Sequence, residues 1–246
     1  MPEGPSIIIL KEAIEALHIV GQKVEAVSGN TSIDQSRLRH QQLTAVKSWG
    51  KQFFLCFPCL SLRIHFLLWG SYRINERKEA PVRLRLNFKK DELNFYACSL
   101  KIIEEDLDDL YDWSADLMSD SWSPGKTFGK LKSHPELPAC DALLDQQIFS
   151  GVGNIIKNEV LFRIKVHPLA KLGDLSDYKL KKMVKEARAY SFDFLKWKKA
   201  FELKKHYLIY NQKSCPECHG PVTRMPAGKN NRRSFFCARC QKQGKS

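Results

Sequence analysis

The chain has 246 residues and a mass of 28.4 kDa, enough for one large domain or two moderate ones. Its hydrophobic content of 43% is typical of a globular protein, and no apolar run reaches the length needed to cross a membrane. The net charge of +13 is uneven, because residues 154–246 hold 22 Lys and Arg against 7 Asp and Glu, whereas residues 1–153 hold 18 against 20. This asymmetry favours a nucleic acid bound mainly by the C-terminal part over an acidic protein; a merely soluble basic surface is the alternative.

The N-terminus lacks a basic region followed by an apolar run and a cleavage site, so we expect an intracellular protein. The eight cysteines do not indicate a disulfide framework. Four of them form two C-x-x-C pairs near the C-terminus, and the others lie at apolar or isolated positions.

The chain begins Met1-Pro2-Glu3-Gly4-Pro5. Removal of the initiator Met would leave Pro2 with a free secondary amine, whose unperturbed pKa is about 7.7–8.0. Such an amine can attack an aldehyde-like carbon and give an iminium, and Glu3 places a carboxyl group beside it. On these residues alone, the favoured interpretation is that the prolines stiffen the terminus and Glu3 complements a helix dipole.

A helix is expected over residues 6–17, because apolar residues recur with helical spacing and Gly21 follows its end. From residue 22 to about 100 the pattern changes to short strands at 43–49, 52–57, 60–66 and 82–88, which suggest a sandwich or barrel-like sheet. Cys56 and Cys59 flank Pro58 in an expected hairpin turn, and we interpret both as packing residues.

Residues 104–120 contain eight acidic residues and no basic one, which indicates a solvated stretch at the end of the first domain. Ser, Pro and Gly are frequent in residues 121–129, a plausible domain boundary. We therefore expect an N-terminal domain at 1–121, a helical domain at 122–212 and a Cys-bounded hairpin at 213–246.

The second domain should contain short helices at 140–149 and 154–162 and a longer helix at 176–201, with Leu180, Val184, Ala187 and Phe194 facing inward. The turn Gly151-Val152-Gly153-Asn154 separates the short helices. Its glycines permit close backbone approach, and the helix N-terminus offers N–H groups to a phosphate. The side chain of Asn154 either adds a hydrogen-bond donor for the phosphate or caps the helix. From this turn alone, capping is the favoured interpretation.

Cys215 and Cys218 form one C-x-x-C pair, and Cys237 and Cys240 form the other, 18 residues later. Four thiolates at this spacing predict one tetrahedral Zn²⁺. Four protein ligands leave no open position for catalysis, so the zinc is expected to be structural. Basic residues between the pairs give the hairpin a cationic tip.

Taken together, these motifs resemble the formamidopyrimidine-DNA glycosylase/endonuclease VIII family of base-excision repair enzymes, and the resemblance runs from end to end. The matching segments are Met-Pro-Glu at the start, Gly50-Lys51, His65-Phe-Leu-Leu-Trp-Gly-Ser-Tyr-Arg73, Gly151-Val-Gly-Asn154 and Arg232-Arg-Ser-Phe-Phe-Cys237. Each motif alone is weak, but five in the family's order are specific.

The resemblance implies an α+β fold, in which an N-terminal helix and β-sandwich precede a helical domain with a helix–two-turns–helix and a zinc β-hairpin. It also implies a DNA glycosylase with abasic-site lyase activity that binds damaged DNA as a monomer. Pro2 would attack C1′ of the damaged nucleotide, Glu3 would transfer the proton at the sugar ring oxygen, and β,δ-elimination would nick the strand.

Further roles follow from the matched positions. Lys51, His65, Asn154 and Arg232 would hold phosphates around a flipped nucleotide, with Arg233 as the alternative to Arg232. Otherwise Lys51 is a solvated hairpin residue and His65 an ordinary strand residue. The resemblance also implies that Leu67, Leu68 and Trp69 fill the gap that the flipped nucleotide leaves in the base stack, with Leu68 favoured as the inserted residue. The alternative is that these residues form an ordinary strand and turn.

One departure from the family pattern is informative. The formamidopyrimidine branch has an Arg-Phe pair that contacts the base opposite the lesion, whereas residues 95–100 here contain no Arg. With Gly4-Pro5, this resembles the endonuclease VIII branch and implies a preference for oxidised pyrimidines. The alternatives are an 8-oxoguanine enzyme of the first branch and a non-catalytic, zinc-containing DNA-binding protein.

Overall fold

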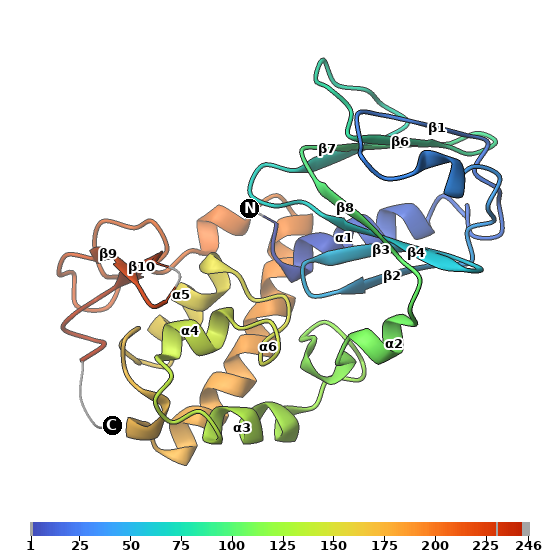
Figure 1. Ribbon diagram of the computed structural model, residues 1–246. Coiled ribbons are helices and arrows are strands. Elements are labelled where there is room, and N and C mark those ends of the chain that lie inside the picture. The colour runs from blue at the N-terminus through green and yellow to red at the C-terminus, as the bar shows by residue number, and fades with distance from the viewer. Residues whose placement is uncertain (1, 230, 243–246) are drawn as a thin grey trace. The chain divides into compact units, whose positions relative to one another are not determined.

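The computed structural model describes residues 2–229 and 231–242 and divides into two compact units, residues 1–111 and 112–246 (Figure 1). Among the described residues, no helix is both long enough and apolar enough to span a membrane. The predicted boundary between the first two domains lies ten residues further along, and the predicted hairpin segment 213–246 forms part of the second unit.

Unit 1 consists of a helix, α1 (Gly4–Glu15), and two four-stranded antiparallel sheets, with short helices η1 (Gln35–Arg37) and α2 (Leu107–Leu110). One sheet has the order β2-β3-β4-β8 and the other β1-β6-β7-β5. The strands are β1 (Ala26–Ser28), β2 (Ala45–Trp49), β3 (Gln52–Phe57), β4 (Leu60–His65), β5 (Ser71–Ile74), β6 (Leu84–Asn87), β7 (Glu92–Tyr96) and β8 (Ser99–Ile103). The expected sandwich is confirmed, and the four strands named from the sequence match β2, β3, β4 and β6 to within two residues.

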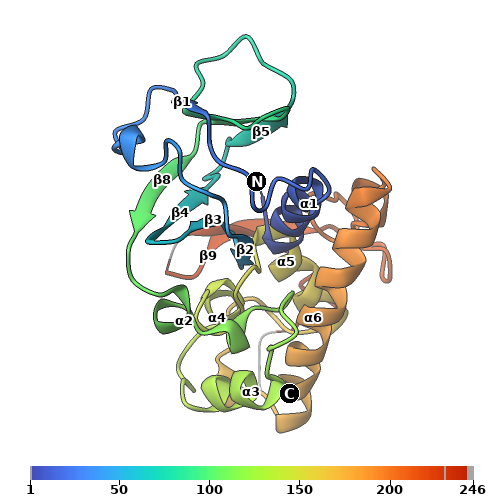
Figure 2. The ribbon, with the colours of Figure 1, turned by 90° about the vertical axis from the view of Figure 1, so that its right-hand side faces the viewer.

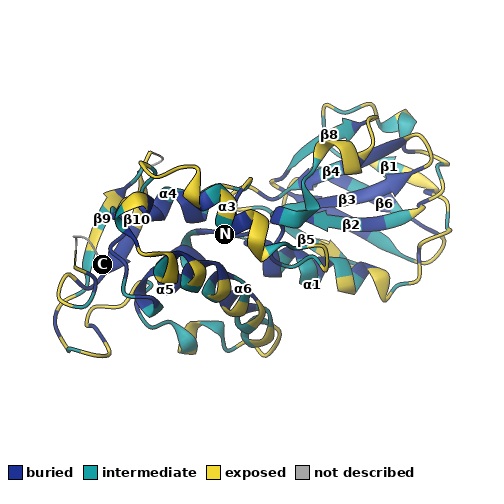
Figure 3. Cartoon of the chain, turned by 90° about the horizontal axis from the view of Figure 1, so that it is seen from below, coloured by how far each residue is buried: buried dark blue, intermediate teal, exposed yellow. Residues whose placement is uncertain are grey.

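Alternation of apolar residues makes this sandwich, because it gives each sheet one apolar face. Phe53 and Leu62 of one sheet and Leu86 and Phe95 of the other are buried in a single core. Figure 3 shows the buried residues along these strands. The turn at Pro58 is confirmed, but only Cys56 is a packing residue. Cys59 is exposed, because it lies in the two-residue turn itself.

The acidic stretch 104–120 is not uniformly solvated. Ala115, Asp116 and Leu117 are buried, and Asp116 accepts a hydrogen bond from the Met118 N–H at 2.9 Å. The Asp112 carboxylate accepts a 2.8 Å hydrogen bond from Lys130, which lowers its pKa to about 2. These contacts attach residues 112–121 to unit 2, which explains why the unit begins earlier than the expected boundary.

The described residues of unit 2 form four helices, three short 3₁₀ segments and a two-stranded hairpin. They are η2 (Trp113–Ala115), α3 (Pro124–Lys132), α4 (Ala139–Leu144), α5 (Asn154–Arg163), η3 (Leu172–Asp174), α6 (Asp177–Lys199), η4 (Leu203–His206), β9 (Thr223–Ala227) and β10 (Arg232–Phe236). Ser176 caps α6, and the four residues expected to face inward are buried.

Helix α4 ends at Leu144, five residues before the predicted end. Asp145 leaves the helical conformation, and its carboxylate accepts the Gln147 N–H at 2.8 Å. The Gln146 amide then spans the turn, donating to the Leu144 and Val152 carbonyls and accepting from the Gly151 N–H. Local side-chain hydrogen bonds therefore replace the last helical turn.

A buried carboxylate joins α5 to the segment that leads into the hairpin. Glu159 is fully buried and accepts hydrogen bonds from the backbone N–H groups of Leu208, Ile209 and Tyr210 at 2.8–3.1 Å. Burial raises the pKa of its carboxyl group, and the N–H donors act in the opposite direction. The chain between α6 and the hairpin is thus held by one side chain.

Replacing Glu159 with Ala should destabilise unit 2 markedly, because one buried and two partly buried N–H groups lose their acceptor. At about 1–3 kcal/mol for each unsatisfied group, the loss should reach about 3 kcal/mol or more. Denaturant unfolding measures it. Glu186→Ala is the matched control, since it removes a partly exposed carboxylate paired with Arg163, and it should cost less than about 1 kcal/mol. Equal effects of the two changes would contradict this interpretation.

Candidate functional site

The N-terminal segment places a carboxyl group in the interior. Pro2 is half-buried, and Glu3 is fully buried at the N-cap position of α1. The Glu3 side chain makes no capping hydrogen bond to the helix, while its carbonyl accepts the Ser6 N–H at 2.8 Å. Glu3 is therefore not a solvated surface charge, and a carboxyl group buried in this way requires polar partners around it.

Lys51 lies in the turn before β3, and His65 ends the neighbouring strand β4. Gly50 and Lys51 form the two-residue turn between β2 and β3, and Gly50 has a φ of 55°, which a glycine adopts without strain. Gln52, directly after the turn, pairs with His65 in the register of β3 and β4. The structure therefore brings together two of the side chains predicted to bind phosphate.

His65 is a neutral donor in this setting. Burial lowers the pKa of its imidazole below the ordinary value of 6.5, and the charges of Arg63 and Lys51 lower it further. Its Nδ1 accepts the Leu67 N–H at 3.3 Å, so the proton of the neutral ring lies on Nε2. That nitrogen can donate one hydrogen bond to an anion.

Three apolar residues protrude directly after β4. Leu67, Leu68 and Trp69 expose 52%, 46% and 86% of their surfaces. Gly70 closes the turn by donating to the Phe66 carbonyl at 2.8 Å, and a Cβ on it would lie 2.2 Å from that oxygen. The stretch is a turn, as the structural interpretation predicted. Its apolar side chains are exposed to water, however, which is unfavourable unless a binding partner covers them.

The connection that follows β7 is short. Only Ala97 and Cys98 separate β7 from β8, with a φ of 48° at Ala97 and Cys98 buried. A two-residue turn has no room for a protruding side-chain pair, in agreement with the absence of Arg from this stretch.

The turn before α5 presents a helix N-terminus. Gly151 has a φ of 98°, and Gly153 is the N-cap residue of α5. Asn154 does not cap the helix, contrary to the favoured reading of this turn; its side-chain amide donates to the Arg233 carbonyl at 3.0 Å instead. Its Oδ1 is buried, with no hydrogen-bond partner among the described residues.

Two further residues of α5 form hydrogen bonds with β10. Lys157 is fully buried, and its ammonium group donates to Ser234 Oγ at 2.8 Å and to the Arg233 carbonyl at 3.3 Å. Asn158 accepts the Phe235 N–H at 2.8 Å. Together with Asn154, these side chains form what we call the α5–β10 joint, which fixes the strand that carries Arg232 and Arg233.

Arg232 and Arg233 are both exposed and adjacent on β10, so their side chains point to opposite faces of the hairpin. The hairpin tip is attached to α4, because the Asp141 carboxylate accepts the Lys229 N–H at 3.0 Å. Gly228 is required there, since a Cβ on it would lie 2.1 Å from the Asp141 carboxylate.

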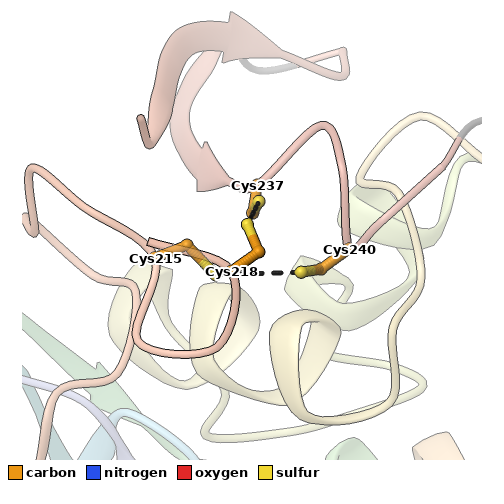
Figure 4. Close-up of side chains that lie close together, drawn as sticks. All are labelled: Cys215, Cys218, Cys237 and Cys240. Carbon is orange, nitrogen blue, oxygen red and sulfur yellow. Dashed lines mark hydrogen bonds between the residues drawn. The ribbon is translucent and has the colours of Figure 1, made fainter. Parts of the chain in front are cut away.

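The four cysteines of the C-x-x-C pairs meet at one point (Figure 4). All four Sγ atoms lie within 4.8 Å of one another, with 3.8 Å between those of Cys215 and Cys240 and 3.4 Å between those of Cys218 and Cys237. Tetrahedral zinc at a Zn–S distance of about 2.3 Å separates its sulfur ligands by about 3.8 Å. The donor set and its spacing therefore fit one tetrahedral metal ion.

Gln241 anchors this cluster to the rest of unit 2. It is fully buried, accepts the Cys237 N–H at 3.0 Å and donates to the Val166 carbonyl at 2.8 Å. Sequence reasoning missed Gln241, together with Asp141, Lys157, Asn158 and Glu159. The only signal was three consecutive polar residues in α5, a pattern that is typical of a solvated helix face.

Two family profiles match the chain. The formamidopyrimidine-DNA glycosylase N-terminal domain matches residues 1–98, and the formamidopyrimidine-DNA glycosylase H2TH domain matches residues 126–193. Among curated proteins, Endonuclease 8-like 3 of Mus musculus is 34% identical over 81% of this chain, and Endonuclease 8-like 2 of Bos taurus is 35% identical over 73%. DNA-(apurinic or apyrimidinic site) lyase Nei2 of Mycolicibacterium smegmatis is 30% identical over 72% of each protein.

The chain spans 34–47% of the length of the four Endonuclease 8-like 3 relatives that it matches. Among solved structures, Lactococcus lactis formamidopyrimidine-DNA glycosylase bound non-covalently to DNA with an AP site superposes with a TM-score of 0.86. The match covers 98% of this chain and 100% of the other at 18% identity, a likeness of fold.

Acidification should weaken unit 1 through His65. The unfolded chain takes up a proton near pH 6.5 and the folded chain only at lower pH, so stability falls as the pH drops through 6.5. His65→Gln should reduce this loss, as measured by denaturant unfolding of unit 1 over a pH series.

His40→Asn serves as the control, because His40 is an exposed residue of the same unit at a positive φ that Asn tolerates. It should keep the wild-type pH dependence. A His65→Gln profile that is identical to the wild-type profile would contradict the assignment.

Proposed function

This chain belongs to the formamidopyrimidine-DNA glycosylase/endonuclease VIII family, in its endonuclease VIII branch, and on that premise we propose that it is a bifunctional DNA glycosylase and abasic-site lyase of base-excision repair. The observation that carries this proposal is the pairing of Pro2 with Glu3, a fully buried carboxyl group that does not cap its own helix. A protein that only binds DNA needs neither group.

The reaction begins at the secondary amine of Pro2 once Met1 has been removed. The nitrogen attacks C1′ of the damaged nucleotide, the bond between C1′ and the base breaks, and the proton that the amine gives up neutralises the departing base. Glu3 transfers a proton at the sugar ring oxygen as the ring opens, which leaves an iminium between Pro2 and C1′. Elimination of the 3′ and then the 5′ phosphate releases the strand ends and nicks the DNA.

The DNA contacts of unit 1 come from the β2–β3 turn and the end of β4. Lys51 supplies a charge and His65 one N–H donor to phosphates beside the flipped nucleotide, consistent with the lowered pKa of the imidazole. Leu67, Leu68 and Trp69 fill the space that the extruded nucleotide leaves, a role supported by their exposure.

In unit 2, the N-terminus of α5 and the tip of β10 hold phosphates. One N–H of the Asn154 amide is used by the Arg233 carbonyl, so its second N–H and the helix N-terminus serve the DNA. Arg232 is the proposed β10 contact, with Arg233 on the opposite face as the alternative. The α5–β10 joint holds these two contact points in a fixed relation.

We assign Zn²⁺ to the four-cysteine site, where it would be bound by Cys215, Cys218, Cys237 and Cys240 and would stabilise the hairpin without taking part in the reaction. The fit of four thiolates to a closed tetrahedral site supports this assignment. So does the small core of the hairpin, which cannot stabilise a segment of this length alone.

Cys237→Ser should remove the metal and weaken DNA binding, while unit 1 stays folded, because the hairpin core depends on all four ligands. Metal analysis should return about one zinc ion per chain for the wild type. Cys140→Ser, at a buried cysteine of unit 2 outside the cluster, controls for the loss of a thiol and should keep the metal. Full DNA affinity in the metal-free Cys237→Ser protein would contradict the proposed role.

Lesion choice should favour oxidised pyrimidines over 8-oxoguanine paired with C, and the opposite base should matter little. The two-residue β7–β8 turn leaves no side chain to contact that base. Excision rates on duplexes with thymine glycol, 5-hydroxycytosine and 8-oxoguanine measure the preference. Fastest cleavage of 8-oxoguanine opposite C would assign the substrate to the other branch.

Borohydride added during turnover should couple the protein to damaged DNA through Pro2, because it reduces the iminium. Glu3→Gln should lose base excision yet keep some cleavage of a preformed abasic site, where less proton transfer is required. A variant with a residue retained before Pro2 has an amide nitrogen at that position and should bind lesion DNA without cutting it. Peptide mapping of the trapped complex identifies the coupled residue.

Lys51→Ala is the matched control for trapping. Lys51 supplies a phosphate contact in this proposal, so its loss should weaken binding and still allow coupling through Pro2. Robust cleavage by the N-terminally blocked protein, or coupling at Lys51, would falsify the assignment of the nucleophile.

A further inference from the structure

Unit 2 contains an apolar groove between α3 and α6, two helices that lie side by side in Figures 1 and 2. Its volume is about 640 Å³, within the range of about 300–1,000 Å³ in which proteins bind ligands and anchoring side chains. Trp122, Phe128 and Phe192 supply aromatic surface, and Phe192 is 43% exposed.

Cations surround this aromatic surface. The Lys181 ammonium lies 5.5 Å from the ring centroid of Phe128, and the Arg188 guanidinium lies 4.8 Å and 5.1 Å from those of Trp122 and Phe192. Lys185 also lines the groove and is exposed. The groove therefore combines an apolar floor with a positive rim.

Arg188 is held in place by hydrogen bonds, so this part of the groove is preformed. One of its terminal nitrogens donates to the carbonyl oxygens of Leu117 and Ser119 at 3.0 Å and 3.1 Å. These bonds tie the loop before α3 to α6 and shape one wall of the groove. A rigid site loses little entropy on binding, a property of preorganised docking surfaces.

The proposed DNA contacts of unit 2 do not use this groove. Asn154 and Arg232 belong to α5 and β10, whereas α3 and the first half of α6 lie at the other end of the unit in both views (Figures 1 and 2). A phosphate backbone also gains little from an apolar hollow, and one terminal nitrogen of Arg188 already serves two carbonyl groups.

We propose that the groove between α3 and α6 binds a short acidic segment of a partner protein, which inserts one large apolar side chain between flanking carboxylates. The apolar side chain fills the space between Trp122, Phe128 and Phe192, and the carboxylates pair with Lys181 and Lys185. Charge complementarity selects an acidic segment, and the aromatic lining of the groove selects an apolar anchor. This inference does not depend on the proposed DNA chemistry.

Two glycines of α3 provide a matched test. A Cβ on Gly125 or on Gly129 would meet no atom within 4 Å, so either position accepts a larger side chain, but only Gly125 lines the groove. Gly125→Phe should fill the groove, and Gly129→Phe should leave it open. Both variants are made in the full chain, and denaturant unfolding confirms that each is folded.

The probe is a display library of random linear peptides, selected on the wild-type protein and measured by fluorescence polarisation. Selection should enrich peptides with acidic residues beside Leu, Phe or Trp. Gly125→Phe should weaken their binding by about tenfold or more, equivalent to about 1.4 kcal/mol, and Gly129→Phe should not. Lys185→Glu should weaken binding more than Lys182→Glu, since Lys182 lies on the same helix but does not line the groove.

The proposal would be overturned if the selection enriched no motif that combines acidic and apolar residues, or if the two glycine variants bound the peptides equally well. It would also be overturned if a single-stranded oligodeoxynucleotide displaced the peptides. The last result would identify the groove as a nucleic-acid site. Unchanged cleavage of abasic-site DNA by Gly125→Phe separates a failure of this proposal from a failure of the proposed enzymatic function.

Discussion

The geometry of unit 2 depends on polar side chains of α5 that are buried or engaged by neighbouring segments. Asn154, Lys157 and Asn158 bind β10 through the Arg233 carbonyl, the Ser234 hydroxyl and the Phe235 N–H, and Glu159 holds the segment that leads into the hairpin. An ammonium group or a carboxylate loses several kcal/mol of hydration in the interior, so each is tolerated only where hydrogen bonds replace water. These bonds have strict directions, and they therefore specify one position for the hairpin where apolar packing would allow several.

The proposed DNA contacts of unit 1 depend on backbone conformation instead. Gly50 lies in the turn that connects β2 to β3. In the turn after β4, Leu67 has a positive φ, and Gly70 lies too close to the Phe66 carbonyl for a Cβ to fit. Both turns follow strands whose register is fixed by the core of the sandwich. A rigid sheet with tight turns presents a charge, a neutral imidazole donor and an apolar protrusion without the freedom of a long loop.

Much of this was predictable from the sequence. Hydrophobic alternation located β2, β3, β4 and β6, and the C-x-x-C pairs located the four-cysteine cluster, because both are local patterns with one dominant cause. The buried face of α5 was not predictable, since Lys157, Asn158 and Glu159 are typical of a solvated surface until their partners, some fifty to eighty residues away, are known. The same limit explains Asn154: its partner on β10 outcompetes the capping role that its local sequence indicates. The early end of α4 has a local cause, the hydrogen bonds that the Asp145 and Gln146 side chains make within the following turn. Such bonds and a further helical turn are close in free energy, so hydrophobic periodicity does not predict which of the two forms.

The α5–β10 joint bears on how the hairpin is inherited. A metal-bound hairpin is often regarded as a cassette that recombination can move between proteins, because its ligands lie within one short segment. Here Ser234 and the Arg233 carbonyl accept hydrogen bonds from the buried ammonium group of Lys157 in α5. Gln241 donates a hydrogen bond to the carbonyl of Val166, which follows α5 in the chain. A foreign hairpin would still offer a backbone carbonyl at the position of Arg233, but without a hydroxyl at position 234 or an amide at position 241 it would leave Lys157 and the Val166 carbonyl each short of one hydrogen bond. Zinc ligands alone therefore do not make a hairpin interchangeable in this fold, because its fit also depends on residues of α5 more than seventy positions earlier in the chain.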